Sequence, residues 1–198
     1  FGWDNQTVNS TTATLTQNTD TMTLFCPDPS LADELRVITR PMPATFDLKV
    51  CHKATLHNQP NLTNYFGAGI RDSINGDIIL CASSLQDSSS GDNKDRTLVS
   101  HFDNSNTFNS PHLNSPDDAE WHFNGRDLQW IRVRFDGSDL EFYTSTGVDW
   151  VLVHTEDMTV SPWTSISPDQ LVFLGNAGNS TSNQDVHSTV VCWREDVL

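Results

Sequence analysis

Short runs of β-prone residues, separated by turn residues at intervals of about 8 to 15 positions, occupy almost the whole chain. No window longer than about ten residues carries apolar groups at helical spacing. The pattern therefore predicts an all-β protein, and strands of this length and spacing are typical of a β-sandwich or jelly roll. We expect strands over residues 22–26, 35–40, 46–52, 65–72, 77–82, 96–102, 128–135, 140–144, 150–154, 170–175 and 188–193.

Two hairpins are indicated by their turn dipeptides. Asn75 and Gly76 lie between two apolar runs, as do Asp136 and Gly137. Asn-Gly and Asp-Gly tolerate the positive φ angles that a type I′ turn requires. Asp72, just before the first turn, is expected to accept hydrogen bonds across that hairpin.

The second hairpin also shows a strict alternation of side-chain character. Ile131, Val133 and Phe135 share one face of the expected strand, and Arg132 and Arg134 share the other. One face should therefore belong to the core, and the other should face solvent or a ligand.

Three polar segments, 85–96, 103–118 and 178–185, are expected to be loops that leave the sandwich. Long loops in a compact domain are often functional. No internal repeat and no linker-like segment divides the chain, so we expect one domain over residues 1–198.

Composition limits the classes of partner. The chain has 198 residues, with 10 Phe and 6 Trp to build a core despite a hydrophobic fraction of 36%. No stretch approaches the roughly 18 to 20 apolar residues that would span a membrane. A net charge of −15, from 11 Lys and Arg against 26 Asp and Glu, makes nucleic acid an unsuitable partner.

The four cysteines are widely spaced and form no CxxC pair, which excludes a zinc ribbon. Cys26, Cys51, Cys81 and Cys192 each have apolar or β-prone neighbours, and this context favours buried thiols over a disulfide framework.

Motifs of catalysis are missing from the sequence. There is no GxSxG, no HExxH and no ExDxE string of the kind that jelly-roll glucanases carry. Asp139 and Glu141 lie two apart on one strand, but such a pair is usually a solvated face. On these grounds we expect a protein that is not an enzyme.

Two loops carry clustered oxygen ligands that could hold calcium, namely Asp92, Asn93 and Asp95 in one and Asp117 and Asp118 in the other. The EF-hand pattern is absent, and chance clustering in so acidic a chain is the alternative interpretation. No other cofactor is expected.

Aromatic side chains are the remaining candidates for ligand contact, because sugar rings stack on exposed indole faces. Trp121 and Trp163 stand among polar neighbours in loops and are expected either to contact a ligand or to pack within the loop. Trp130, Trp150 and Trp193 fall inside strand patterns and are expected in the core.

The stretch from Trp130 to His154 resembles the hairpin of concanavalin A-like, laminin-G-like jelly rolls, with an RVR-x-DG strand and turn followed by Ser145, Gly147 and Trp150. The rest of the chain resembles members of that superfamily found in bacteriophage tail proteins and bacterial surface modules. The matching landmarks are Phe1, Trp3, Asn5, Gln6, the strand before Cys26, and the segments 40–46, 64–76 and 173–176.

This resemblance implies a concanavalin A-like jelly-roll β-sandwich of two antiparallel sheets. It also implies a non-catalytic adhesion or receptor-binding domain of a phage tail or virion appendage, on the extracellular virion surface, that recognises host surface glycans and assembles as a trimer. A structural virion protein that binds other virion proteins is one alternative, and a glycanase or its carbohydrate-binding module is another. The expected glycan contacts are Trp121, His122, Trp163, Asp92, Asn93 and Asn179, and the expected calcium ligands are Asp92, Asp95, Asp117 and Asp118.

Overall fold

The computed structural model describes residues 13–18, 21–26, 35–57, 63–86, 94–104, 107–113, 129–145, 147–176 and 185–198. Nearly all of the secondary structure in these ranges is strand, with one short 3₁₀ helix, η1 (Trp163–Ser165). The strands are β1 (Thr14–Gln17), β2 (Met22–Cys26), β3 (Arg36–Pro41), β4 (Phe46–His57), β5 (Thr63–Arg71), β6 (Ile78–Gln86), β7 (Lys94–Asn104), β8 (Thr107–Leu113), β9 (Gln129–Phe135), β10 (Asp139–Ser145), β11 (Val151–Asp157), β12 (Gln170–Asn176) and β13 (Asp185–Asp196).

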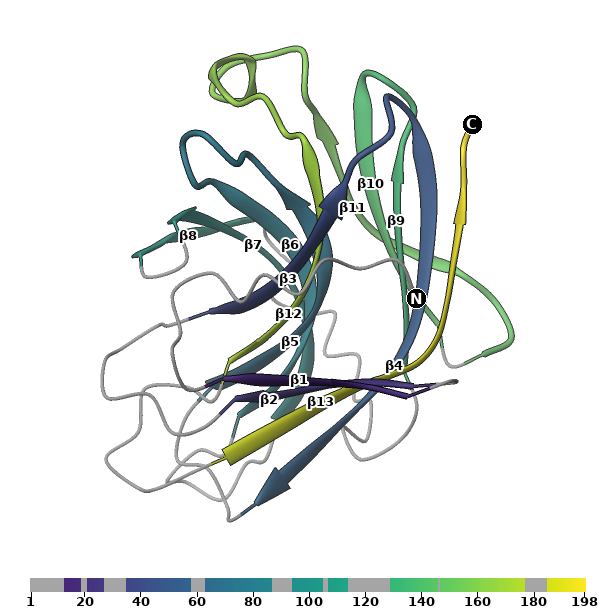
Figure 1. Cartoon of the computed structure of the whole chain (residues 1–198). Coiled ribbons are helices and arrows are strands. Elements are labelled where there is room, and N and C mark those ends of the chain that lie inside the picture. The colour runs from purple at the N-terminus through teal and green to yellow at the C-terminus, as the bar shows by residue number, and fades with distance from the viewer. Residues whose placement is uncertain are drawn as a thin grey trace.

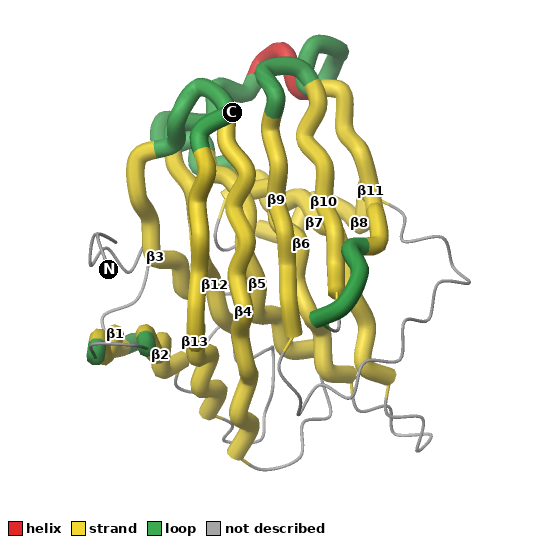
Figure 2. The backbone as a smooth tube through the Cα atoms, turned by 90° about the vertical axis from the view of Figure 1, so that its right-hand side faces the viewer, coloured by secondary structure: helices red, strands yellow, loops and turns green. Residues whose placement is uncertain are grey.

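The strands form two antiparallel sheets that lie face to face (Figure 1). One sheet has seven strands in the order β1-β2-β13-β4-β9-β10-β11, and the other has six in the order β3-β12-β5-β6-β7-β8. Figure 2 looks onto the seven-stranded sheet, with the short helix and several turns gathered at one end of its strands. The predicted concanavalin A-like jelly-roll sandwich is confirmed. Within the described residues, no helix is long and apolar enough to cross a membrane.

The alternation along β9 places its side chains as predicted. Ile131 and Val133 are buried between the sheets, whereas Arg132 and Arg134 lie on the outer face of the seven-stranded sheet. Leu140 and Phe142 of β10 join the same core from the neighbouring strand. Burial of these apolar groups fixes the register, since a slip of one residue would exchange the two faces.

The main core fills the space between the sheets. Its fully buried members include Phe46 and Leu48 from the seven-stranded sheet and Ile38, Ala68 and Phe173 from the six-stranded sheet. A second buried apolar cluster lies on the outer face of the six-stranded sheet, because its residues alternate along the strands with those that face the main core. We call it the outer cluster; its members are Leu35, Val37, Ile78, Leu80, Ala82, Phe102, Val172 and Leu174.

Gly67 and Gly69 allow β5 and β6 to approach closely. A Cβ at Gly67 would lie 2.1 Å from the carbonyl oxygen of Cys81, and one at Gly69 would lie 2.0 Å from that of Ile79. Any larger residue at these two positions would push the strands apart.

The turn after β5 is longer than the predicted two-residue turn and spans residues 72–77, with φ of 93° at Gly76. The cause is Asp72, whose carboxylate accepts hydrogen bonds from the backbone N–H groups of Ile74, Asn75 and Ser167. Burial alone would raise the pKa of Asp72, but these hydrogen bonds outweigh it and hold the pKa below its usual value.

Two strands were missed by the sequence reasoning, and both are edge strands. β1 lies at the edge of the seven-stranded sheet, and β8 lies at the edge of the six-stranded sheet, inside the segment 103–118 that was predicted to be a loop. β6 and β7 also extend into the predicted loop 85–96. β1 has only four residues, and the β8 sequence contains Pro111, which is disfavoured within a strand, so neither shows a clear period of two.

The cysteines agree in part with the predicted buried thiols. Cys26, Cys51 and Cys81 are free and buried, whereas Cys192 is free and exposed. Burial raises the pKa of Cys26 and of Cys81 to about 12, so both thiols stay protonated and unreactive at neutral pH.

Candidate functional site

The outer face of the seven-stranded sheet carries a row of cations that crosses three adjacent strands. Arg194 of β13 lies opposite Lys49 of β4, and Lys49 lies opposite Arg132 of β9. We call these three residues the cationic row. Like charges directly opposite one another destabilise a sheet, so the row needs a compensating interaction.

Two carboxylates on the same face supply that compensation. Asp47 accepts hydrogen bonds from the Arg132 Nε at 2.7 Å and from Nη2 at 3.0 Å, and its Oδ2 lies 2.7 Å from the Lys49 Nζ. Asp196 binds Arg194 at 2.9 Å and lies 3.5 Å from the Lys49 Nζ. Three cations and two anions leave this network with one excess positive charge.

Ionisation in the network follows from these contacts. Burial acts to raise the pKa of Asp47, but hydrogen bonds and charge from Arg132 and Lys49 outweigh it and lower the pKa below its usual value. The hydrogen bond to Asp47 raises the pKa of Arg132 in turn. Both groups are therefore charged across the neutral pH range.

Tyr143 of β10 continues the cationic row on the next strand. It lies opposite Arg132, whose guanidinium carbon is 4.8 Å from the centre of the Tyr143 ring. Burial, together with the hydrogen bond and charge of Glu141, raises the pKa of Tyr143, so its hydroxyl is protonated at neutral pH. Glu141 also accepts a hydrogen bond from Arg134.

An aromatic pair adjoins this network. The rings of Trp130 and Trp150 meet edge to face, with centroids 6.3 Å apart, and both side chains are half-buried. Trp130 is two residues from Arg132 on β9, a step of about 7 Å along the same face. Leu152, which is 50% exposed and lies opposite Tyr143, extends the apolar surface.

The outer face of the seven-stranded sheet gathers charged groups of both signs. Alternation along the strands assigns to it five of the chain's 11 Lys and Arg residues (Lys49, Lys53, Arg132, Arg134 and Arg194) and five carboxylates (Asp47, Asp139, Glu141, Asp157 and Asp196). With half-exposed indole rings beside it, the face offers both charge and stacking surfaces to an elongated ligand.

Trp163, one of the predicted ligand contacts, does not lie in the open loop that was expected. Trp163 is 2% exposed; its indole N–H donates to Glu156, and its ring meets that of His101 edge on. With that burial the ring presents no face to a ligand. Asp95 lies within β7, where a calcium-binding loop was expected. The remaining predicted site residues lie outside the described residues: Trp121, His122, Asp92, Asn93, Asn179, Asp117 and Asp118.

The aromatic pair was missed because strand patterns were equated with burial. Trp130 falls in the same phase as Arg132 and Arg134, not in the phase of Ile131 and Val133, so the alternation itself assigned it to the outer face. Trp150 precedes β11, and no comparable signal marked it. Trp193, also predicted in the core, is partly buried and packs against the main core.

Comparisons with known proteins bear on the fold. No family model matches the chain, and no curated protein matches it. Among solved structures, a protein of unknown function from Saccharomyces cerevisiae is similar with a TM-score of 0.64 and 15% identity, over 99% of this chain and 95% of that one. An endo-acting O-glycanase of the human gut microbiota is similar with a TM-score of 0.54 and 9% identity, over 99% and 90% of the two chains. An alginate lyase from Klebsiella pneumoniae gives 0.52 and 10%, over 93% and 84%.

These likenesses correct the predicted function. Two of the three solved structures are of carbohydrate-degrading enzymes, and none of the three is of a virion protein. The non-catalytic phage adhesion domain and the expectation that the chain is not an enzyme are therefore wrong on these findings. Virion partners and a trimer find no support in them, whereas a single domain, calcium and an extracellular location stay untested predictions.

Proposed function

We propose that the protein degrades an anionic polysaccharide, which lies along the cationic row and is cleaved by β-elimination at Tyr143. The single observation that carries the proposal is the register that aligns Arg194, Lys49, Arg132 and Tyr143 across four strands. The likeness in fold to an alginate lyase and an O-glycanase supports a carbohydrate substrate.

Binding in this proposal depends on charge and stacking. A uronate or sulfate group would pair with Arg194, which is 73% exposed, and with Lys49, which is 25% exposed. The sugar rings beside it would stack on the Trp130 and Trp150 pair. Attraction of an anionic chain would depend on these two cations, because carboxylates elsewhere in this acidic protein would repel it.

The chemistry in this proposal rests on Tyr143 and its neighbours. In an elimination the C5 proton of a uronate leaves, the C4–O bond breaks and a C4=C5 double bond forms. Arg132 and Arg134 would stabilise the negative charge that develops on the uronate carboxylate. Glu141 would accept the carbon-bound proton, Tyr143 would protonate the leaving oxygen, and their shared hydrogen bond would return the proton to Tyr143.

Hydrolysis by a pair of carboxylates suits this face less well. A glycosidase needs one carboxylic acid with a raised pKa beside a second carboxylate. Asp47 has a lowered pKa and is therefore ionised at the pH at which it would have to protonate a leaving group.

The test is an eliminase assay on the full chain with alginate, a pectate and neutral xylan, following the ultraviolet absorbance of the unsaturated product ends. We expect cleavage of a uronate polymer and none of xylan. Tyr143→Phe should lower the rate at least about 100-fold without weakening binding, since positioned proton transfer contributes about 10²–10⁴-fold. Tyr65→Phe, which removes the chain's other tyrosine hydroxyl from β5, is the matched control and should keep full activity.

Two results would overturn the elimination step. Products with saturated ends would make the protein a hydrolase. Binding of alginate, lost in Arg194→Gln but accompanied by no cleavage of any polymer, would make it a binding module.

A further inference from the structure

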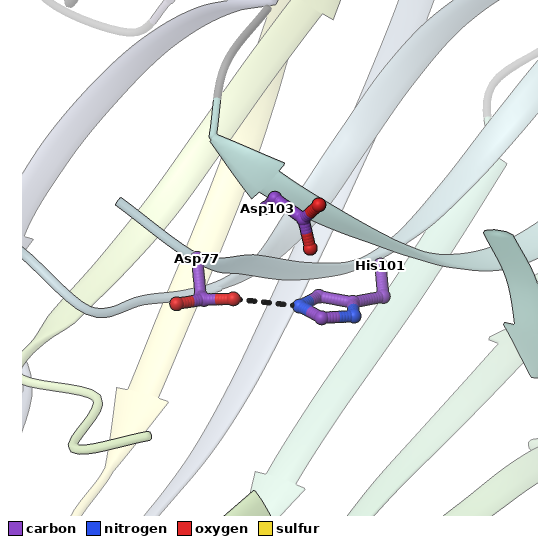
Figure 3. Close-up of side chains that lie close together, drawn as sticks. All are labelled: Asp77, His101 and Asp103. Atoms are coloured by element: carbon purple, nitrogen blue, oxygen red, sulfur yellow. Dashed lines mark hydrogen bonds and ion pairs between the residues drawn. The ribbon is translucent and has the colours of Figure 1, made fainter. Parts of the chain in front are cut away.

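A second cluster of chemistry-bearing side chains lies on the other sheet, away from the cationic row. Asp77, His101 and Asp103 each offer one ligand atom, and these atoms all lie within 4.8 Å of one another. The His101 Nε2 is 2.9 Å from the Asp77 Oδ1, and the Asp103 carboxylate lies beside that pair (Figure 3).

The strand register explains why the three residues converge. Ile78 of β6 pairs with Phe102 of β7, so Asp77 lies opposite Asp103 at the end of this ladder. Ile79 and His101 form the next pair. Asp77, His101 and Asp103 all belong to the phase that faces the other sheet, and this brings both carboxylates to the imidazole.

Neighbouring groups hold two of these side chains in place. The Trp163 ring of η1 meets the His101 ring at 5.1 Å between centroids, with an interplanar angle of 68°. His101 is 5% exposed and is therefore fixed within the packing. The Asn109 side-chain amide of β8 donates a hydrogen bond to Asp103.

We propose that Asp77, His101 and Asp103 form a binding site for one divalent transition-metal ion of the zinc type. The ligands are the His101 Nε2 and one oxygen from each carboxylate. This site does not depend on the polysaccharide-degrading function, because His101 and Asp103 lie on β7 of the six-stranded sheet and Asp77 directly precedes β6, whereas the cationic row belongs to the other sheet.

The donor set selects the kind of ion. Calcium takes about six to eight oxygen ligands and magnesium is also bound mainly through oxygen, whereas imidazole favours zinc and related metals. Two carboxylates and a neutral imidazole carry the charge that balances a divalent cation. Three protein ligands leave a coordination position open, as in zinc sites that bind water or a substrate group. Asn109 and Trp163 are the outer partners that orient the ligands.

The test measures metal binding directly on the full chain, freed of metals by a chelator. Equilibrium dialysis followed by elemental analysis should find one zinc per chain, and titration calorimetry should give its affinity. Asp103→Asn should weaken zinc binding at least about tenfold. Asp103 is exposed, so this variant is expected to fold as the unmodified chain does, which circular dichroism checks.

Asp149→Asn is the matched control, because Asp149 is also an exposed carboxylate and lies in the β10–β11 connection of the seven-stranded sheet. It makes the same change of charge and should bind zinc as the unmodified chain does. The proposal is overturned if the chain binds no zinc, if calcium binds more tightly than zinc, or if Asp103→Asn and Asp149→Asn bind zinc alike. Because the measurement is binding, the absence of polysaccharide cleavage has no bearing on it.

Discussion

The outer faces of the two sheets differ in chemical character and in exposure to solvent. On the six-stranded sheet, the outer cluster consists of apolar side chains that are all buried, including Leu80, Phe102 and Leu174. On the seven-stranded sheet, the outer face carries Arg194, Lys49 and other charged groups, with half-exposed indole rings beside them. Only a face in contact with solvent can meet a polymer, so the polysaccharide proposed above would bind the seven-stranded sheet.

The difference also shows how each face is stabilised. Burial of apolar area on the outer face of the six-stranded sheet contributes to stability, whereas exposed ion pairs on the outer face of the seven-stranded sheet contribute little. Substitutions on the two faces should therefore differ sharply in their effect on the free energy of unfolding.

The largest expected effect is at Leu80. Leu80→Ala should lower the free energy of unfolding by about 2–5 kcal/mol, because it removes buried methyl groups and leaves a cavity. Leu152→Ala on the opposite outer face is the matched control and should change it by less than about 0.5 kcal/mol, since Leu152 is 50% exposed. Urea denaturation of both variants measures the difference. Equal effects would show that the two outer faces are alike, and the comparison would fail.

The second largest expected effect is a pH dependence of stability, which differs between His52 in the interior and Asp47 on the polar outer face. His52 is fully buried between the sheets against Phe66, and burial lowers its pKa to about 3 from 6.5. The unfolded chain therefore binds a proton that the folded chain does not, so stability is complete above about pH 6.5 and is lost as the pH falls toward 3. We expect a loss of about 2 kcal/mol between pH 8 and pH 5.

His52→Met should remove this loss while keeping an apolar side chain of similar size. Asp47 on the outer face acts at lower pH, because its lowered pKa contributes stability that disappears only as the pH falls below about 4. Denaturant titrations at pH 8, 6 and 5 measure the slope. A slope that is the same in His52→Met would place the acid sensitivity elsewhere.

The sequence predicted the fold well because burial in a sandwich repeats every second residue. Ile131, Val133 and their neighbours carried that signal clearly, whereas β1 has only four residues and the β8 sequence contains Pro111, so neither shows a clear alternation. The candidate site was harder to predict. The cationic row consists of residues 194, 49 and 132, which are far apart in the sequence. They are neighbours only because β13, β4 and β9 are adjacent in the sheet.

The third expected effect is a difference in stability between two substitutions in the cationic row, one at Arg132 and one at the exposed Arg194. Arg132→Met should cost about 1–2 kcal/mol of stability, since it removes two hydrogen bonds to the buried Asp47 carboxylate. Arg194→Met should change stability by less than about 0.5 kcal/mol, because Arg194 is 73% exposed. Thermal and urea unfolding measure both. If Arg194→Met proved the more destabilising, Arg194 would be a structural residue and would not be free to bind a polyanion.

The smallest effect on stability is expected at Trp150. The edge-to-face contact with Trp130 contributes about 0.5–1.5 kcal/mol, and half-exposure of both rings places Trp150→Ala near the lower end. Its effect on polysaccharide binding should be larger, because each stacked ring adds a contact that the cationic row cannot replace.

Trp193→Ala is the control variant. That indole packs against the main core and lies 5.0 Å from the Arg40 guanidinium, so its loss should lower stability and leave binding unchanged. Measurements of unfolding and of alginate binding on both variants would separate the two roles, and binding lost equally in both would remove the aromatic pair from the site.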